Sequence, residues 1–233
     1  SNINVSNSDF IGNSSEPIAS LTNSSPNISS NIFTGNGNSY WIFSSDIDCE
    51  PNINNCIFNG NVSKAIRVDC ESIIKNCSFS GASNNGIEII GSAFNNNAII
   101  DYEKHQGESL YKIIGGDIEI LNSSTLEVKQ GVTLAFESGC GIKIGRDCSY
   151  CHEDDHGELR AVGTSSEPII FTSITGSSSG WKGLFFDKSS LFTNSILQNC
   201  IIENAGQLGR PNVYVKNSNS LSITKCIIKD SGS

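Results

Sequence analysis

Short stretches of alternating apolar and polar residues recur along the chain, and each of them ends in Gly, Asn or Ser. Three copies, at residues 55–58, 76–79 and 97–100, follow one another at a constant step of about 21 residues. Looser copies lie at residues 8–12, 31–35, 199–202 and 225–228. Each copy predicts a short strand followed by a turn.

A single strand of this kind cannot bury its apolar side chains alone, whereas stacked copies can. The pattern lacks the 3.6-residue period of a helical solenoid. We therefore predict an all-β fold, a right-handed parallel β-helix with rungs of about 21–25 residues. The prediction treats residues 1–233 as one domain.

Stacked rungs place equivalent side chains above one another, about 4.8 Å apart. Cysteines at such positions are expected to be small buried apolar residues, although disulfides between rungs are within reach at this spacing. Asn31 is expected to stack with its neighbours in the same way. The predicted columns pair Cys56 with Cys77 and Cys49 with Cys70, and align Phe10, Phe33, Phe58 and Phe79.

Residues 118–206 carry a recognisable series of strand-like segments, at 131–134, 157–164, 167–172, 181–184 and 200–206. This part of the chain resembles the right-handed parallel β-helix region of many bacterial and archaeal surface proteins. The resemblance implies the same fold and an extracellular, cell-surface location. It implies little chemistry, because the same coil supports enzymes, adhesins and passive stalks.

Composition narrows the choice of partners. The net charge is −9, and only three Lys or Arg occur in the first hundred residues, which disfavours nucleic acid and anionic membranes. No apolar run approaches the length of about 18 residues that a membrane-spanning helix needs, so we expect no membrane insertion. The odd count of nine cysteines prevents all of them from pairing within the chain. Sequons compatible with an exported glycoprotein begin at Asn4, Asn13, Asn23, Asn27, Asn61, Asn76 and Asn122.

An insertion interrupts the surface-protein pattern at residues 146–156, which read RDCSYCHEDDH. Insertions in solenoids lie at turns and often carry function. Within it, Cys148, Cys151 and His152 form C-x-x-C-H, which resembles the haem-attachment motif of c-type cytochromes. Two thiols at this spacing can bond the two vinyl groups of a porphyrin, and the adjacent His can reach the iron. The motif implies covalent haem c, with His152 as an axial ligand.

A second axial ligand would come from His156 or from His105, which lies in the polar stretch 101–109. His105 could act within its own chain or from a neighbouring copy. Arg146 and Arg160 are candidates for pairing with the haem propionates. Ligation by two histidines favours electron transfer, because it leaves no open site on the iron.

Other chemistry remains open for the same loop. Cys140, Cys148, Cys151 and His156 could form a tetrahedral zinc site. Cys148 and Cys151 could instead form a disulfide. Calcium is a weaker alternative, because the acidic residues match no known loop spacing. These residues are Asp147, Glu153, Asp154, Asp155 and Glu158.

Taken together, the sequence predicts an extracellular structural β-helix that carries one covalent haem and transfers electrons within a surface filament or assembly. Its expected partners are further copies of itself, packed end to end or side by side, or other surface or redox proteins. The alternative is a surface adhesin or stalk with a structural zinc or disulfide in the loop. A polysaccharide lyase is disfavoured, since the acidic pair Asp154-Asp155 has no aligned face of Lys or Arg.

Overall fold

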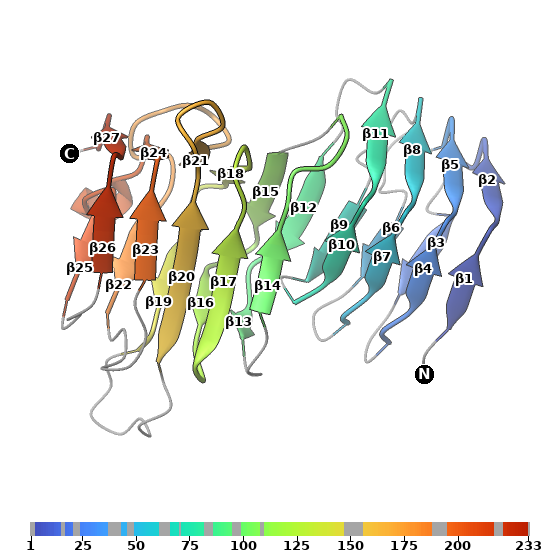
Figure 1. Ribbon diagram of the computed structural model, residues 1–233, viewed down its shortest axis with the longest axis horizontal. Coiled ribbons are helices and arrows are strands. Elements are labelled where there is room, and N and C mark those ends of the chain that lie inside the picture. Colours follow the sequence, from blue (N-terminus) through green and yellow to red (C-terminus); the bar gives the residue numbers. More distant parts are fainter. Residues whose placement is uncertain are drawn as a thin grey trace. The chain divides into compact units, whose positions relative to one another are not determined.

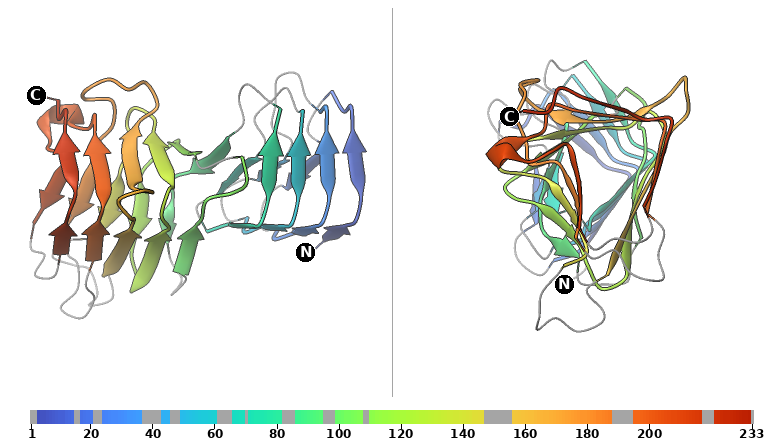
Figure 2. Two further views of the ribbon diagram at one scale, coloured as in Figure 1. Left: turned by 45° about the horizontal axis from the view of Figure 1, so that its top comes forward. Right: turned by 90° about the vertical axis from the view of Figure 1, so that its left-hand side faces the viewer.

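The computed structural model describes residues 3–14, 17–20, 24–36, 43–45, 49–60, 66–69, 71–81, 86–94, 99–107, 110–146, 156–187, 195–216 and 221–232. Two compact units share these residues: unit 1 is Ser1–Ile90 with Lys104–Tyr111, and unit 2 is Gly91–Glu103 with Lys112–Ser233. Both are built from short parallel strands, and together they contain about seven stacked turns (Figures 1 and 2). The prediction of an all-β parallel solenoid is confirmed. That the coil forms one domain over 1–233 stays a prediction.

Unit 1 has three parallel sheets. The first contains β1 (Asn4–Ser6), β4 (Asn27–Ser29), β7 (Asn52–Asn54) and β10 (Ile73–Lys75). The second contains β2 (Asp9–Ile11), β5 (Ile32–Thr34), β8 (Ile57–Asn59) and β11 (Ser78–Ser80). The third contains β3 (Ile18–Ser20), β6 (Phe43–Ser45), β9 (Ile66–Asp69) and β12 (Ile87–Ile90).

Unit 2 repeats the arrangement with longer turns. One sheet contains β13 (Ala93–Phe94), β16 (Ile118–Ile120), β19 (Ile142–Ile144), β22 (Leu184–Phe186) and β25 (Val213–Val215). A second contains β14 (Ile99–Tyr102), β17 (Ser124–Val128), β20 (Gly157–Val162), β23 (Ser195–Gln198) and β26 (Leu221–Thr224). The third contains β18 (Thr133–Phe136), β21 (Ile169–Ser173), β24 (Cys200–Glu203) and β27 (Ile227–Lys229). The chain also forms β15 (Leu110–Ile114) and the short 3₁₀ helix η1 (Gln207–Gly209).

The predicted rung length is confirmed in unit 1 and is too short for part of unit 2. In unit 1, Asn4 pairs with Asn27, Asn27 with Asn52 and Asn52 with Ile73, and all three steps fall within the predicted range. In unit 2, Ile142 pairs with Leu184, a step well beyond that range. Insertions between strands lengthen the step while leaving the register of the strands intact.

One of the copies aligned from the sequence is wrong. The alignment stacks 97–100 upon 76–79, but Ile99 pairs with Thr125 in a different sheet, within unit 2. Ser78 pairs with Ile57 of β8 on one side and, on the side where the alignment expects 97–100, with Gln106. A backbone hydrogen bond of 2.8 Å from Phe79 N–H to the Gln106 carbonyl secures this pairing. The repeat spacing misleads here because residues 97–100 have the expected composition and follow 76–79 at the expected step, although they belong to another sheet.

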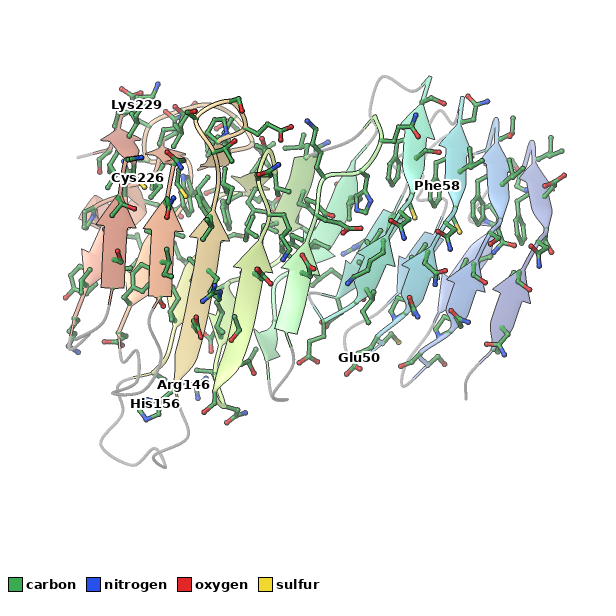
Figure 3. All side chains as sticks on the ribbon, viewed as in Figure 1. Glu50, Phe58, Arg146, His156, Cys226 and Lys229 are labelled. Carbon is green, nitrogen blue, oxygen red and sulfur yellow. The ribbon has the colours of Figure 1, made fainter. Side chains whose placement is uncertain are left out.

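The predicted aromatic column is present in unit 1. Successive rings of Phe10, Phe33, Phe58 and Phe79 stack almost parallel, with centroids 4.9, 4.9 and 5.0 Å apart. Phe58 projects from β8 (Figure 3) and is 1% exposed. Since strand side chains alternate between faces, one aromatic position per rung suffices to fill the core at this sheet.

The cysteine column is also confirmed. Asn55 and Asn76 adopt positive φ of 54° and 52° at the corner before each cysteine, a conformation that Asn tolerates better than most residues. The following side chains, Cys56 and Cys77, therefore turn inward and are buried. A hydrogen bond with the Cys77 thiol lowers the pKa of Cys56 to about 7. The second predicted pair cannot be followed, because Cys70 lies outside the described residues.

Asn31 occupies the equivalent inward position two rungs from Cys77, and its amide completes the backbone pairing. Its Oδ1 accepts the Ser8 N–H at 3.0 Å, and its Nδ2 donates to the Val5 carbonyl at 2.8 Å. The side chain is fully buried. This arrangement explains why a polar residue can sit in the core of a coil.

We expect Asn31→Ala to lower the free energy of unfolding by about 1–3 kcal/mol, because it leaves a backbone donor and a backbone acceptor unpaired. Asn27→Ala is the matched control. That residue lies on an exposed position of β4, and its loss should change stability by less than about 0.5 kcal/mol. Urea unfolding followed by circular dichroism measures both. Equal effects of the two substitutions would contradict the assigned role of Asn31.

Within the described part of the chain, no helix has the length and apolar character needed to cross a membrane.

Candidate functional site

The candidate site is the segment 146–156, here called the cofactor loop. Cys148, Cys151 and His152 lie outside the described residues. The ends of the loop, Arg146 and His156, are described; Arg146 follows β19 and His156 precedes β20 (Figure 3). The insertion therefore joins two strands that belong to different sheets of unit 2, as expected for a loop at a corner of the coil.

Strand register locates the extra residues. Ile118 of β16 pairs with Ile142 of β19, a step close to the predicted rung length. In the next sheet, Ser124 of β17 pairs with Gly157 of β20, and this step is longer because the segment 146–156 falls within it. The strands on both sides keep their parallel pairing. The additional chain is thus accommodated between β19 and β20 without disturbing the wall.

Backbone contacts fix both ends of the loop to the preceding rung. Gly145 N–H donates to the Ile120 carbonyl at 2.9 Å, and Ser123 N–H donates to the His156 carbonyl at 2.8 Å. At Gly157, a Cβ atom would collide with the Ile120 carbonyl oxygen, so only glycine fits this close approach. The points at which the loop leaves and rejoins the wall of unit 2 are therefore defined.

A network of charged side chains lies at the base of the loop. Arg146 donates to Glu119 at 2.8 Å, and Lys143 bridges Glu119 and Asp117 at 2.8 Å each. Burial favours a raised pKa for Glu119, but the hydrogen bonds from Lys143 and Arg146 outweigh it and hold that pKa below its ordinary value. Lys182 adds a second cation to Asp117 at 3.0 Å.

The two arginines predicted to meet propionates already have carboxylate partners. Arg146 pairs with Glu119, and Arg160 pairs with Glu158 at 3.3 Å. Both arginine side chains are somewhat less than half exposed. An exposed ion pair contributes little free energy, so an incoming propionate could replace either carboxylate at small cost.

The two candidate second ligands have different surroundings. His156 is half-buried, and its Nδ1 atom is buried without a hydrogen-bond partner among the described residues. His105 belongs to unit 1, where it is 4% exposed and its Nε2 lies 2.7 Å from the Tyr111 hydroxyl. Its ring also packs edge-on against Phe79, with centroids 5.8 Å apart. Ligation by His105 would require this buried contact to open, whereas His156 is itself the last residue of the loop.

The zinc alternative includes Cys140, which precedes β19 at the end of the strand away from the loop. Its side chain is 1% exposed, and burial raises the pKa of its thiol. A zinc site that used this residue would need to draw the thiol out of the core as a thiolate. Among the residues described, no group of three or more His, Cys, Asp or Glu side chains is arranged to hold a metal ion. All six described cysteines are free thiols.

The charged network was not apparent from the sequence. One contact in it could have been found, because Glu119 and Lys143 are separated by one rung of the repeat. Asp117 and Lys182 lie 65 residues apart and become neighbours only through the long insertions of unit 2. No local pattern indicates such a contact.

Comparisons with known protein families, with curated proteins and with solved structures found no match to this chain.

Proposed function

We propose that the protein is an extracellular structural β-solenoid that carries one covalently bound haem in the cofactor loop and takes part in electron transfer. The observation that carries the proposal is the string Cys148-Ser149-Tyr150-Cys151-His152 within an insertion. The two thiols would bond the porphyrin, and His152 would ligate the iron. Bound haem would supply a one-electron redox centre.

The surroundings of the loop are compatible with this assignment. His156 is our choice for a second axial ligand, because its Nδ1 has no hydrogen-bond partner among the residues that the structure describes. Arg146, with an exposed guanidinium at the base of the loop, is the nearest described candidate for a propionate. Backbone hydrogen bonds to Ile120 and Ser123 fix the two points at which the loop leaves and rejoins the wall of unit 2.

The test is production of the full chain in a host that has the machinery for cytochrome c maturation. We expect sharp visible bands on reduction, and a haem-sized mass increment on the peptide that contains Cys148 and Cys151. The double substitution Cys148→Ser and Cys151→Ser should abolish both signals. Cys226→Ser, at a half-buried cysteine outside the loop, should retain them.

Elemental analysis of the same protein separates the two readings of the loop. A colourless protein that contains one zinc per chain would refute the haem proposal and support a surface adhesin or stalk with a structural metal. A colourless, zinc-free protein with a linked Cys148–Cys151 peptide would support the disulfide version of that alternative. His156→Ala should alter the visible spectrum of the haem protein without removing the covalent increment.

A further inference from the structure

A second feature of unit 2 is a surface pocket of about 370 Å³, which involves none of the cofactor-loop residues. Its base is formed by outward-facing side chains of two neighbouring strands, because register pairs Phe185 of β22 with Tyr214 of β25. Asp187 and Lys216 follow two residues later on the same faces. The pocket is completed by Gly209, the last residue of η1, and by Arg210 and Pro211, which follow it.

Arg210 is the unusual residue in this pocket. Its guanidinium carbon lies 4.8 Å from the centroid of Phe185, a cation–π contact that fixes its position. The chain has 24 acidic residues against 15 basic ones. Even so, no carboxylate pairs with Arg210 in the described part of the structure. A cation held in place without an anion is suited to binding an anionic ligand.

Two other residues that line the pocket, Tyr214 and Asp187, indicate further properties of its ligand. Tyr214 is 41% exposed, and its ring is tilted against Phe185 with centroids 6.0 Å apart, so part of an aromatic ring is available for contact with a ring-shaped ligand. The Asp187 Oδ1 atom is buried and has no hydrogen-bond partner among the described residues. Lys216 approaches it only to 3.7 Å. The Asp187 side chain as a whole is 34% exposed, so the accessible part of its carboxylate can accept a hydrogen bond from a ligand hydroxyl.

We propose that this pocket binds a hydroxylated ring that carries a carboxylate, which is the chemistry of a sugar acid. The carboxylate pairs with Arg210, the ring lies against Tyr214, and one hydroxyl donates to Asp187. The volume falls within the range typical of small-ligand sites. A neutral sugar offers no anion to Arg210, and an aromatic acid without hydroxyl groups donates no hydrogen bond to Asp187.

Saturation-transfer NMR on the full chain tests the proposal with three probes: glucuronate, glucose and benzoate. We expect glucuronate to bind in the millimolar range and the other two to bind more weakly. Arg210→Gln should weaken glucuronate binding about tenfold or more, through loss of a charge-assisted hydrogen bond. Tyr214→Ala should weaken glucuronate and glucose by similar factors, because both lose the ring contact.

The control is Lys75→Gln, which removes one positive charge from β10 in unit 1 and should leave binding unchanged. Unchanged thermal unfolding midpoints of Arg210→Gln and Tyr214→Ala would show that these variants remain folded. Equal binding of glucuronate and glucose, or no effect of Arg210→Gln in a folded protein, would overturn the proposal. Stronger binding of benzoate than of glucuronate would also overturn it, since the Asp187 contact would then play no part.

Discussion

Phe58→Ala is expected to lower the free energy of unfolding by about 4 kcal/mol. Phe58 is 1% exposed and has a stacked ring on each side, Phe33 at 4.9 Å and Phe79 at 5.0 Å. Removing it deletes apolar contact with both neighbouring rungs and leaves a cavity in the middle of the column. Backbone pairing between parallel strands keeps the flanking rungs at their spacing, so the cavity cannot readily collapse.

Ile57→Ala is the matched control, because Ile57 is the adjacent residue of β8 and is 43% exposed. Its loss should cost less than about 1 kcal/mol. Phe58→Leu should fall between the two, since it keeps most of the apolar volume and loses the ring stacking.

Hydrogen exchange followed by mass spectrometry adds a spatial measurement to urea unfolding. Each rung of a solenoid contacts mainly its neighbours, so protection should fall first in β5, β8 and β11. A uniform loss of protection over unit 1, or equal costs for Phe58→Ala and Ile57→Ala, would show that the aromatic column does not stabilise the coil in the way described.

The parts of the fold that could be predicted are those in which chemistry repeats at a short, constant step. Phe10, Phe33, Phe58 and Phe79 have the same environment in successive rungs, so the same residue type serves each time. In unit 2 the steps are unequal, as the positions 118, 142 and 184 of one paired column show, and the register cannot be read from spacing. The insertion at 146–156 was recognisable because it interrupts a segment with a familiar strand order.

The surroundings of His105 show why other features could not be predicted. Its polar neighbours indicate a loop, and its distance along the chain from Phe79 does not match the step of the repeat. The structure instead places its ring edge-on against Phe79, between the stacked phenylalanines and Tyr111. The pocket around Arg210 has a similar origin, because Phe185 and Tyr214 meet only through the pairing of β22 with β25. Such contacts depend on turn lengths, which the composition of the turns does not specify.

Lowering the pH from 7 to 5 is expected to reduce the free energy of unfolding by about 2 kcal/mol through His105 alone. Burial lowers the pKa of His105 from 6.5 to about 4. The folded protein thus keeps this imidazole neutral at pH values where the unfolded chain binds a proton. The contribution of His105 to the free energy of unfolding is fully present above pH 6.5 and falls progressively as the pH drops towards 4. The total loss is about 3 kcal/mol.

The packing around the imidazole ring explains why the pKa of His105 is lowered and why stability falls at acidic pH. One nitrogen contacts the Tyr111 hydroxyl at 2.7 Å, and the other, Nδ1, is buried with no hydrogen-bond partner in the described residues. A proton on both nitrogens would place a charge beside the apolar ring of Phe79 in a buried position, and burial disfavours the charged form. The Tyr111 hydroxyl can accept one hydrogen bond but cannot neutralise the charge.

His105→Phe supplies the comparison, because it keeps an aromatic ring at the end of the column and removes the titrating group. Urea unfolding at pH 7, 6 and 5 should show a steeper loss of stability for the native chain than for the variant. The difference between the two slopes isolates His105 from the other histidines. NMR titration of the folded protein should place the imidazole pKa near 4. Parallel pH profiles for the two chains, or an imidazole that titrates near 6.5 in the folded protein, would mean that His105 is hydrated and not enclosed by Phe79 and Tyr111.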